Sequence, residues 1–479
     1  MSLKDTLDVI GNLSIKKNKK IYLVGGFLRD IYLGQPGRDL DFAVSGNAMN
    51  LAQEVAEVLK GVYIPLDRIN RVARVVLEPR GSKWQIDFSS FKGLSIEEDL
   101  SNRDFTINAM ALELDAYLKL SQENGTLSGK RPDRRRWPEF LTDPYSGLAD
   151  IEGKTIRAIN SYVFEADPVR ILRAVRLSGK LGFKIDPETL SLMEQNRWLL
   201  QEVAGERIWE ELLGILSLPQ SYPLITVLDD TGILSEVFPV KENMSVSGQN
   251  LPTDNVWAHS LKTYKLLEEL CGRLTGIGTG DRAAEIRGLL RKHLDQGLTS
   301  ERKRSQLIKL AALFHDPGNI EVYISEFARR LKMSKVEESY LKNLAGKHTL
   351  PVSLFNKPAR GPADFHRFFI GIGQDTPDVL LLSLANMSAT PDLKSAFDLA
   401  GYRSFIVDLL YKYYFEAEKY INPPILVKGE DLMTELGLRP SRQLGDLLEK
   451  ITEAQVCGEV TSRREAITYA ARLLKENEG

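Results

Sequence analysis

The hydrophobic pattern of this sequence changes about a third of the way along the chain. Up to about residue 160, short runs rich in Val, Ile and aromatic residues alternate with segments of helical spacing, such as 48–59. Beyond that point long helical patterns dominate, as in 166–183 and 206–216. This order predicts an α+β protein in which a small α/β head is followed by a long all-α remainder. The strand candidates are Ile21–Val24, Leu40–Val44, Val72–Leu77 and Trp84–Phe88.

The length of the chain, 479 residues, is too great for one hydrophobic core and predicts several domains. Segments rich in Gly, Pro and polar residues at 121–138, 246–254 and 355–364 mark the expected breaks. The predicted parts are a head at 1–130, a helical neck at 131–250, a further helical domain at 251–355 and a helical body and tail at 356–479.

Composition narrows the class of protein. No run of about 18 apolar residues occurs, which excludes a helical membrane span. The two cysteines, Cys271 and Cys457, suggest neither a disulfide framework nor a cysteine-ligated zinc site, so we expect a cytoplasmic protein. The net charge is −2, so a nucleic-acid partner has to be held by local basic runs, such as those at 131–137 and 291–304.

Two glycines follow the first predicted strand. Gly25 and Gly26 precede a segment, 27–33, that has the character of a short helix. Glycines at such a turn let a ligand approach the backbone closely, and the start of a helix offers unpaired N–H groups that suit phosphate. Taken alone, a Gly-Gly pair is more often an ordinary turn.

Two carboxylates follow soon after the glycines. Asp39 and Asp41 are two residues apart in a predicted strand, so both project from the same face. Two oxygen ligands on one rigid face suit Mg²⁺, which commonly takes one or two carboxylates together with substrate phosphates. Asp87 is a candidate third acid, although an ordinary aspartate at a strand edge is an equal reading. Together these features indicate a nucleoside-triphosphate site for metal-assisted phosphoryl transfer.

Five segments then occur in a specific order. They are GGFLRD (25–30), DLD (39–41), EEDLSNRDFTINAMAL (97–112), DPYSGLADIEGKTIRAI (143–159) and ADPVRILRAVRLSGKLGF (166–183). In this order they resemble the motifs of class II tRNA nucleotidyltransferases and bacterial poly(A) polymerases, within the DNA polymerase beta superfamily. Residues 425–467 are similar to the tail of the bacterial long-form enzymes. The resemblance therefore covers most of the chain.

The resemblance implies an enzyme that adds CMP, AMP or both to the 3′ end of tRNA without a template, using CTP, ATP and Mg²⁺. Asp39 and Asp41 would bind the metal, with Asp87 as a third catalytic acid. Asp167 and Arg170 would read the edge of the base. Asn102 and Ala166 depart from the family pattern, which usually has Arg and Glu there. The implied nucleotide-binding residues are Gly25, Gly26, Arg29, Arg103, Asp104, Asp167, Arg170, Arg173 and Arg176.

Two later segments, 256–270 and 307–319, resemble the metal-dependent HD phosphohydrolase domain. His259, His315 and Asp316 match three of its ligand positions, and His348 follows further on. The remaining ligand pattern is incomplete. We therefore expect the domain at 251–355 to be a degenerate HD-like scaffold that packs helices and contacts tRNA, without phosphohydrolase activity.

The sequence leaves alternatives open. A poly(A) polymerase would share the chemistry but act on other RNA 3′ ends, and a non-catalytic RNA-binding or HD-type regulatory protein would share only the fold. Whether the enzyme adds CCA, CC or A is also open. The segment FSSFKGLSIE (88–97) is short where many full CCA-adding enzymes carry a longer loop, which points to a partial activity. In either tRNA reading, the helical parts would hold the acceptor and T arms.

Overall fold

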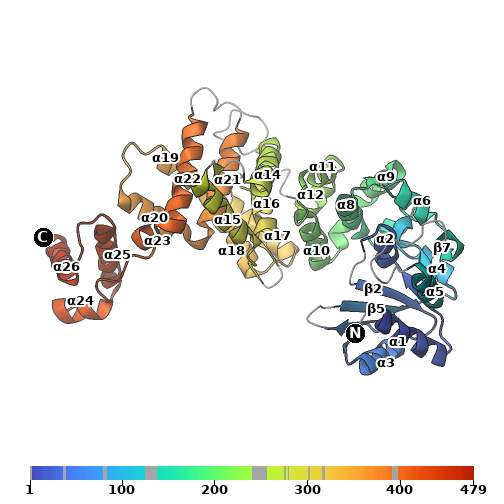
Figure 1. The fold of residues 1–479 in the computed structure, drawn as a ribbon. Helices are drawn as coiled ribbons and strands as arrows, with labels where there is room; N and C mark the ends of the chain where they lie inside the picture. Colours follow the sequence, from blue (N-terminus) through green and yellow to red (C-terminus); the bar gives the residue numbers. More distant parts are fainter. Residues whose placement is uncertain are drawn as a thin grey trace. The chain divides into compact units, whose positions relative to one another are not determined.

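In a computed structural model the chain forms two compact units (Figure 1). The first comprises residues 1–203 with 230–236, and the second comprises 204–229 with 237–479. The α+β class with an N-terminal head and a long helical remainder is confirmed, whereas the four-part division stays a prediction. The structure describes residues 3–35, 39–78, 84–124, 137–239, 256–274, 277–278, 280–299, 302–315, 319–390 and 397–478.

A seven-stranded mixed sheet organises the first unit, with the strand order β3-β4-β5-β2-β1-β6-β7. β2 and β5 run parallel, and each other neighbouring pair is antiparallel. The four predicted strands are confirmed, whereas β3, β6 and β7 were not predicted. The strands are β1 (Ile21–Val24), β2 (Asp39–Val44), β3 (Val62–Asp67), β4 (Val72–Leu77), β5 (Trp84–Ser90), β6 (Ala111–Glu113) and β7 (Leu141–Thr142).

One face of this sheet is packed and apolar. Helix α3 (Ala48–Leu59) lies against β4 and β5, and α1 (Leu3–Lys16) packs against α3 in turn (Figure 1). Asn47 caps α3, because its side chain accepts hydrogen bonds from two backbone N–H groups of the first turn. Phe42 and Phe88 stack beneath the sheet with ring centroids 5.3 Å apart, and both are at most 1% exposed. This packing fixes the faces of β2 and β5 and directs their alternate residues to the opposite side.

Further short helices complete the first unit. Helix α2 follows the glycine turn and α8 is the predicted base-reading helix, which ends at Gly182 in the left-handed region with φ 69°. The helices of this part are α2 (Gly26–Tyr32), α4 (Ile96–Ser101), η2 (Thr106–Asn108), α5 (Leu114–Asn124), η4 (Trp137–Glu139), α6 (Gly147–Glu152), α7 (Val163–Ala166), α8 (Arg170–Leu181), α9 (Pro187–Asn196), η5 (Arg197–Glu202) and α12 (Ile233–Val237). A small two-stranded sheet pairs β8 (Thr155–Ile156) with β9 (Lys184–Ile185).

The second unit is helical throughout its described residues. Its last three helices, α24 to α26, share an apolar core around Leu432, Ile451 and Ala466. No described helix in the chain is long and apolar enough to cross a membrane. The helices are α10 (Gly205–Leu216), α11 (Tyr222–Asp230), α14 (Val256–Arg273), α15 (Asp281–Asp295), α16 (Arg304–Leu313), α17 (Ile320–Arg330), α18 (Lys335–Lys347), α19 (Leu350–Phe355), α20 (Pro362–Ile372), η7 (Gly373–Asp375), α21 (Thr376–Ala389), α22 (Leu399–Phe415), α23 (Ala417–Tyr420), α24 (Gly429–Leu436), α25 (Arg442–Val456) and α26 (Arg463–Glu478).

Part of the predicted basic run at 291–304 is core and not surface. Arg304 is buried, and its Nη1 donates to carboxylate oxygens of Asp375 and Asp378, both at 2.7 Å. His293 Nε2 lies 2.8 Å from the same oxygen of Asp378. Because a buried charge needs partners, Arg304 ties helices α15, α16 and α21 together and is unavailable to a phosphate. The other run, at 131–136, lies outside the described residues.

Replacing Gly147 by alanine is expected to destabilise the head. A Cβ at Gly147 would lie 2.1 Å from the carbonyl oxygen of Thr106, so helix η2 would have to move. Overpacking of this kind commonly costs about 1–3 kcal/mol. Thermal unfolding of the full chain should show a lower melting temperature for Gly147→Ala. Gly288→Ala, which meets no atom within 4 Å, is the matched control and should melt with the native protein or slightly above it. Equal melting of the Gly147→Ala variant would contradict the packing described here.

Candidate active site

The glycine turn after β1 brings two charged side chains together. Gly25 has φ 70° and ψ −145°, a conformation that glycine adopts without strain. A Cβ at Gly25 would lie 3.2 Å from Arg103 Nη1 and 3.2 Å from Asp41 Oδ2. The absence of a side chain therefore lets Asp41 and Arg103 close on the backbone of the turn from two sides. This contact joins three of the residues selected from the sequence.

Strand pairing sets the carboxylates in a row on the open face of the sheet. Asp41 of β2 is directly opposite Asp87 of β5, and Asp39 is opposite Gln85. Paired residues in neighbouring strands point to the same face, as do residues two apart in one strand. The three aspartates therefore share one face. Asp39 is exposed, whereas Asp41 and Asp87 are half-buried.

The next strand adds an arginine to this row. Arg74 of β4 is opposite Asp87, and its Nε and Nη2 donate to the two carboxylate oxygens of Asp87 at 2.7 and 2.8 Å. A bidentate pair of this kind fixes the orientation of both planar groups. Arg74 was not among the residues selected from the sequence. It is the single charged residue in the apolar strand β4, and only the strand order shows that it lies beside Asp87.

The row of acids alters the protonation of Asp41. Burial, the neighbouring Asp87 and the more distant Asp39 raise the pKa of Asp41 to about 6, against the opposing effect of Arg103 and Arg29. A carboxylate that resists ionisation in this way is suited to a cation, because a bound positive charge would favour its ionised form.

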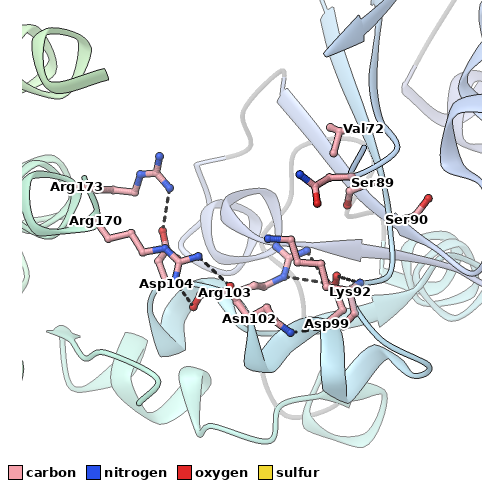
Figure 2. A pocket seen from close by; sticks show the side chains of 11 residues that line it. Val72, Ser89, Ser90, Lys92, Asp99, Asn102, Arg103, Asp104, Arg170 and Arg173 are labelled. Atoms are coloured by element: carbon pink, nitrogen blue, oxygen red, sulfur yellow. Dashed lines mark hydrogen bonds and ion pairs between the residues drawn. The ribbon is translucent and has the colours of Figure 1, made fainter. Parts of the chain in front are cut away.

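A polar cleft of about 240 Å³ opens beside this row (Figure 2). Asn70, Val72, Ser89, Ser90 and Lys92 come from the sheet side and were not selected from the sequence. The remaining lining comes from α4, the segment that follows it and helix α8. The lining residues are Asn70, Val72, Ser89, Ser90, Lys92, Asp99, Asn102, Arg103, Asp104, Arg170 and Arg173.

Acidic partners position two of the arginines that line the cleft. Asp99 Oδ2 accepts from Nη2 of Arg103 at 3.0 Å (Figure 2). Asp104 Oδ2 accepts from Nη1 of Arg173 at 3.3 Å, so the segment after α4 is tied to helix α8. Burial alone would raise the pKa of Asp104, but Arg173 and a hydrogen bond from Asn108 lower it below its usual value. Asp104 therefore holds Arg173 in place as an ionised carboxylate.

The proposed base-reading residues lie at the start of α8. The guanidinium of Arg170 donates to the backbone oxygens of Asn102 at 2.9 Å and Arg103 at 3.2 Å (Figure 2). Asp167 precedes the helix, with its Oδ2 3.9 Å from Arg170 Nε. Arg176 lies further along α8 and does not belong to the described lining of the cleft.

Arg29 occupies a different environment from the other arginines. It is 4% exposed, its Nε donates to Asp30 Oδ1 at 2.8 Å, and its Nη1 donates to Asn108 Oδ1 at 2.5 Å. Asn108 in turn donates to Asp104 at 3.0 Å. A Cβ at Gly26 would lie 3.1 Å from Arg29 Nη2, so Arg29 supports the glycine turn from beneath.

Known proteins resemble this chain over most of its length. A family model described as "Poly A polymerase head domain" matches residues 21–157, and one described as "Probable RNA and SrmB- binding site of polymerase A" matches 182–244. The "CC-adding tRNA nucleotidyltransferase" of Geobacter sulfurreducens is 32% identical and covers 94% of this chain and 91% of its own. The chain belongs to the tRNA nucleotidyltransferase and poly(A) polymerase family.

Other members of the tRNA nucleotidyltransferase family match over a similar extent. The "A-adding tRNA nucleotidyltransferase" of Deinococcus radiodurans is 25% identical and covers 95% of this chain and 96% of its own. The solved structure "Thermotoga maritima CCA-adding enzyme complexed with tRNA_CCA" has a TM-score of 0.64 at 20% identity, and covers 98% of this chain and 95% of its own. At that identity the structural match supports the fold.

Nucleotidyltransferases of this family generally use a divalent metal, and the open face offers donors for one. Asp39 and Asp41 would supply its carboxylate ligands, while Arg74 fixes the orientation of the Asp87 carboxylate beside them. Among the described residues, no group of three His, Cys, Asp or Glu side chains could hold a metal ion by itself. Such a site fits a metal that completes its coordination with substrate phosphates, which is the usual behaviour of Mg²⁺.

Two of the histidines selected for their resemblance to an HD domain lie around one amide. His259 Nε2 and His315 Nε2 lie 2.6 and 3.2 Å from the side-chain oxygen of Asn386, and the rings of His315 and His348 lie 5.0 Å apart. Burial and the nearby His259 lower the pKa of His315 to about 4, so the imidazole is neutral at pH 7. Asp316 lies outside the described residues. The absence of phosphohydrolase activity stays a prediction.

Replacing Asp41 by asparagine should stabilise the metal-free protein while weakening metal binding. The folded-state pKa of about 6 exceeds the usual value, so the native carboxyl holds its proton more tightly than the unfolded one. Native stability therefore falls as pH rises from about 4 to 6, and the full penalty, of the order of 1–3 kcal/mol, persists at pH 7.5. Denaturant unfolding at pH 7.5 should show Asp41→Asn to be more stable than native, with a smaller difference at pH 5.

Metal affinity provides a second measurement on the Asp41→Asn variant. Titration with Mn²⁺ should show a native affinity that decreases below pH 6 and an Asp41→Asn affinity that is weak at every pH. Glu57→Ala, an exposed acid on α3, should match the native protein in both measurements. A native affinity that is constant between pH 5 and 7.5 would disprove the assignment of Asp41 as a ligand.

Proposed function

We propose that this chain transfers CMP from CTP to the 3′ end of tRNA without a template, using Mg²⁺. The observation that carries the proposal is the row of Asp41, Asp87 and Arg74 on the open face, next to the glycine turn and the arginine-lined cleft. Carboxylates on the open face of the sheet and arginines in the lining of the cleft suit a nucleoside triphosphate, whose phosphates need both cations and N–H donors. The extended similarity to tRNA nucleotidyltransferases supports tRNA as the substrate class.

The side chains of the site would have separate roles in the transfer of CMP. Mg²⁺ held by Asp39 and Asp41 would neutralise the triphosphate and stabilise the charge that develops on the reacting phosphorus. Arg103, held by Asp99, is placed to bind the sugar and phosphate part of the nucleotide. Asp87 is the group placed to receive the proton of the attacking 3′-hydroxyl, and Arg74 orients its carboxylate for that role.

Base selection belongs to the start of α8. Asp167 can accept a hydrogen bond from an exocyclic amine, and Arg170 and Arg173 can donate to ring nitrogen and carbonyl acceptors. Cytosine and adenine both present an exocyclic amine beside a ring acceptor, whereas uracil and guanine present a carbonyl there. The edge of the nucleotide can therefore be read by protein groups in place of a template base.

Two observations favour CC addition over complete CCA addition. Only Phe91–Ser95 connects β5 to α4, where many full CCA-adding enzymes carry a longer loop. CC-adding relatives from Geobacter sulfurreducens and a Synechocystis species match more than nine tenths of this chain and of their own length. Addition of A is the second candidate, because the A-adding relative matches to a similar extent.

The proposed partners and cellular location follow from the proposed reaction. The helical second unit would hold the acceptor and T arms of tRNA by shape and backbone charge, and ATP and CTP are the small-molecule partners to compare. Cys271 and Cys457 are free thiols, in keeping with a proposed cytoplasmic location.

Incorporation of labelled nucleotides tests the proposal directly. With Mg²⁺ and both CTP and ATP, the native protein should extend a tRNA transcript lacking CCA by two C residues and then stop, and with ATP alone it should add nothing to that transcript. Asp39→Ala with Asp41→Ala should slow incorporation by at least a thousandfold, while a cooperative thermal unfolding transition shows that the variant is still folded. Glu57→Ala is the control. Long A tracts on unstructured RNA would instead identify a poly(A) polymerase, and addition only to tRNA ending in CC would identify an A-adding enzyme.

Replacement of Asp167 by alanine should relax base choice more than it slows chemistry. Loss of one base-edge hydrogen bond corresponds to about 1–3 kcal/mol, so misincorporation of UMP and GMP relative to CMP should rise about tenfold or more. Arg170→Ala should also lower kcat, because its guanidinium holds the backbone at 102–103. The exposed neighbour Glu165, replaced by alanine, is the control. Unchanged selectivity in Asp167→Ala would remove it from the reading site.

A further inference from the structure

A half-buried asparagine joins two charged side chains from different parts of the candidate site. Arg29 Nη1 donates to Asn108 Oδ1 at 2.5 Å, and Asn108 Nδ2 donates to Asp104 Oδ1 at 3.0 Å. Asn108 ends the short helix η2, which packs against α2 and α6. It was not among the residues selected from the sequence. Its amide is the middle of a continuous polar connection through the head.

One end of this connection is the glycine turn. Arg29 is 4% exposed, and a Cβ at Gly26 would lie 3.1 Å from its Nη2, so the guanidinium lies against the backbone of the turn. Asp30 Oδ1 accepts from Arg29 Nε at 2.8 Å, whereas Asn108 accepts from Nη1. Because both sides of the guanidinium have acceptors, it cannot rotate without breaking a hydrogen bond. The position of the glycine turn is therefore coupled to that of Asn108.

The other end of the connection is helix α8. Asp104 Oδ1 also accepts from the backbone N–H of Phe105 at 2.8 Å, and its Oδ2 accepts from Arg173 Nη1 at 3.3 Å (Figure 2). Phe105 is fully buried, which anchors the backbone that carries Asp104. The hydrogen bonds thus run from Arg29 through Asn108 and Asp104 to Arg173.

The two neighbours of Asn108 make opposite demands on it. A guanidinium has only donors and needs an acceptor, whereas an ionised carboxylate has only acceptors and needs a donor. A side-chain amide meets both demands, because it holds an oxygen and an NH₂ group in one plane. A leucine would meet neither, and an ionised aspartate would repel Asp104. The chemistry of this position therefore favours an amide.

We propose that Asn108 is a positioning residue that fixes the glycine turn relative to the start of α8 and thereby contributes to the selection of CTP. The inference rests on the proposed function and adds a specificity residue to it. The base is checked against α8 only when its triphosphate is held at a constant distance from that helix, and small misplacements of bound groups change rates by large factors. Without the amide, the turn and the helix would each form, but their relative position would vary and UTP would be accepted more readily.

The test is the variant Asn108→Asp, assayed on a tRNA transcript lacking CCA. Its new carboxyl group would replace a donor that lies 3.0 Å from Asp104, and two carboxyl groups this close tend to share one proton. The protonated group donates to Asp104 as the amide does, whereas the ionised group repels it. The ratio of kcat/KM for CTP to that for UTP should be about tenfold below native at pH 8.5 and within about twofold of native at pH 6. This ratio cancels the effect of pH on Asp41, which acts on both nucleotides alike.

A second variant and a matched control accompany the first. Asn108→Ala should be about tenfold less selective than native at both pH values, because it has no group to protonate. It carries the test alone if Asn108→Asp does not fold at pH 8.5. Asn50→Asp, at an exposed position on α3, is the control and should keep the native ratio at both pH values.

The outcomes separate the inference from the proposed function. If the native protein adds CMP but a folded Asn108→Asp either keeps native selectivity at pH 8.5 or fails to regain it at pH 6, the positioning role is wrong and the proposed function stands. If the variants lose rate equally with CTP and UTP, or thermal unfolding shows that neither is folded, Asn108 is purely structural and the inference is overturned. If the native protein adds no CMP, the proposed function fails and the inference with it.

Discussion

The parallel pairing of β2 with β5 is the constraint on which the candidate site depends. Phe42 and Phe88 are opposite each other and stack in the core, so the register cannot shift by one residue without exposing both rings. The same register places Asp41 opposite Asp87 on the other face. Apolar packing beneath the sheet thus holds two carboxyl groups together above it, and burial, together with this proximity to Asp87, raises the pKa of Asp41.

Much of this arrangement could be predicted from the sequence, because it depends on local patterns. The alternation in β2 and β5, the Gly25-Gly26 turn and the spacing of Asp39 and Asp41 each report on a few neighbouring residues. The edge strand β3 was missed, because its side chains are mostly exposed and Pro65 interrupts it, so it lacks the half-buried alternation of a typical strand. Arg74, Asn70 and Val72 were missed because only the strand order brings them to the site.

Charge proved the least reliable guide to surface function. In the second unit Arg304 belongs to a run that reads as an RNA-binding patch, yet its side chain is buried against two aspartates. Lys309 is likewise buried, with its Nζ 2.8 Å from Glu268 Oε1. Whether an arginine faces solvent or a buried acid depends on partners more than 40 residues away in the chain, and no local pattern reports on them. The arginines of α8, by contrast, were selected by their place in an ordered set of motifs.

The contacts that Arg170 and Arg173 of α8 make with the segment at 102–104 affect how base preference could change during evolution. Arg170 holds the backbone of Asn102 and Arg103, and Arg173 holds Asp104. The helix proposed to select the base is therefore bound to the segment that carries Arg103, the arginine proposed to bind the sugar. A substitution that alters one will disturb the other, so intermediates on a mutational path from one nucleotide to another would be slow as well as unselective. Descendants of such an enzyme would change specificity more readily by remodelling a connection such as 91–95 than by exchanging the residues that read the base.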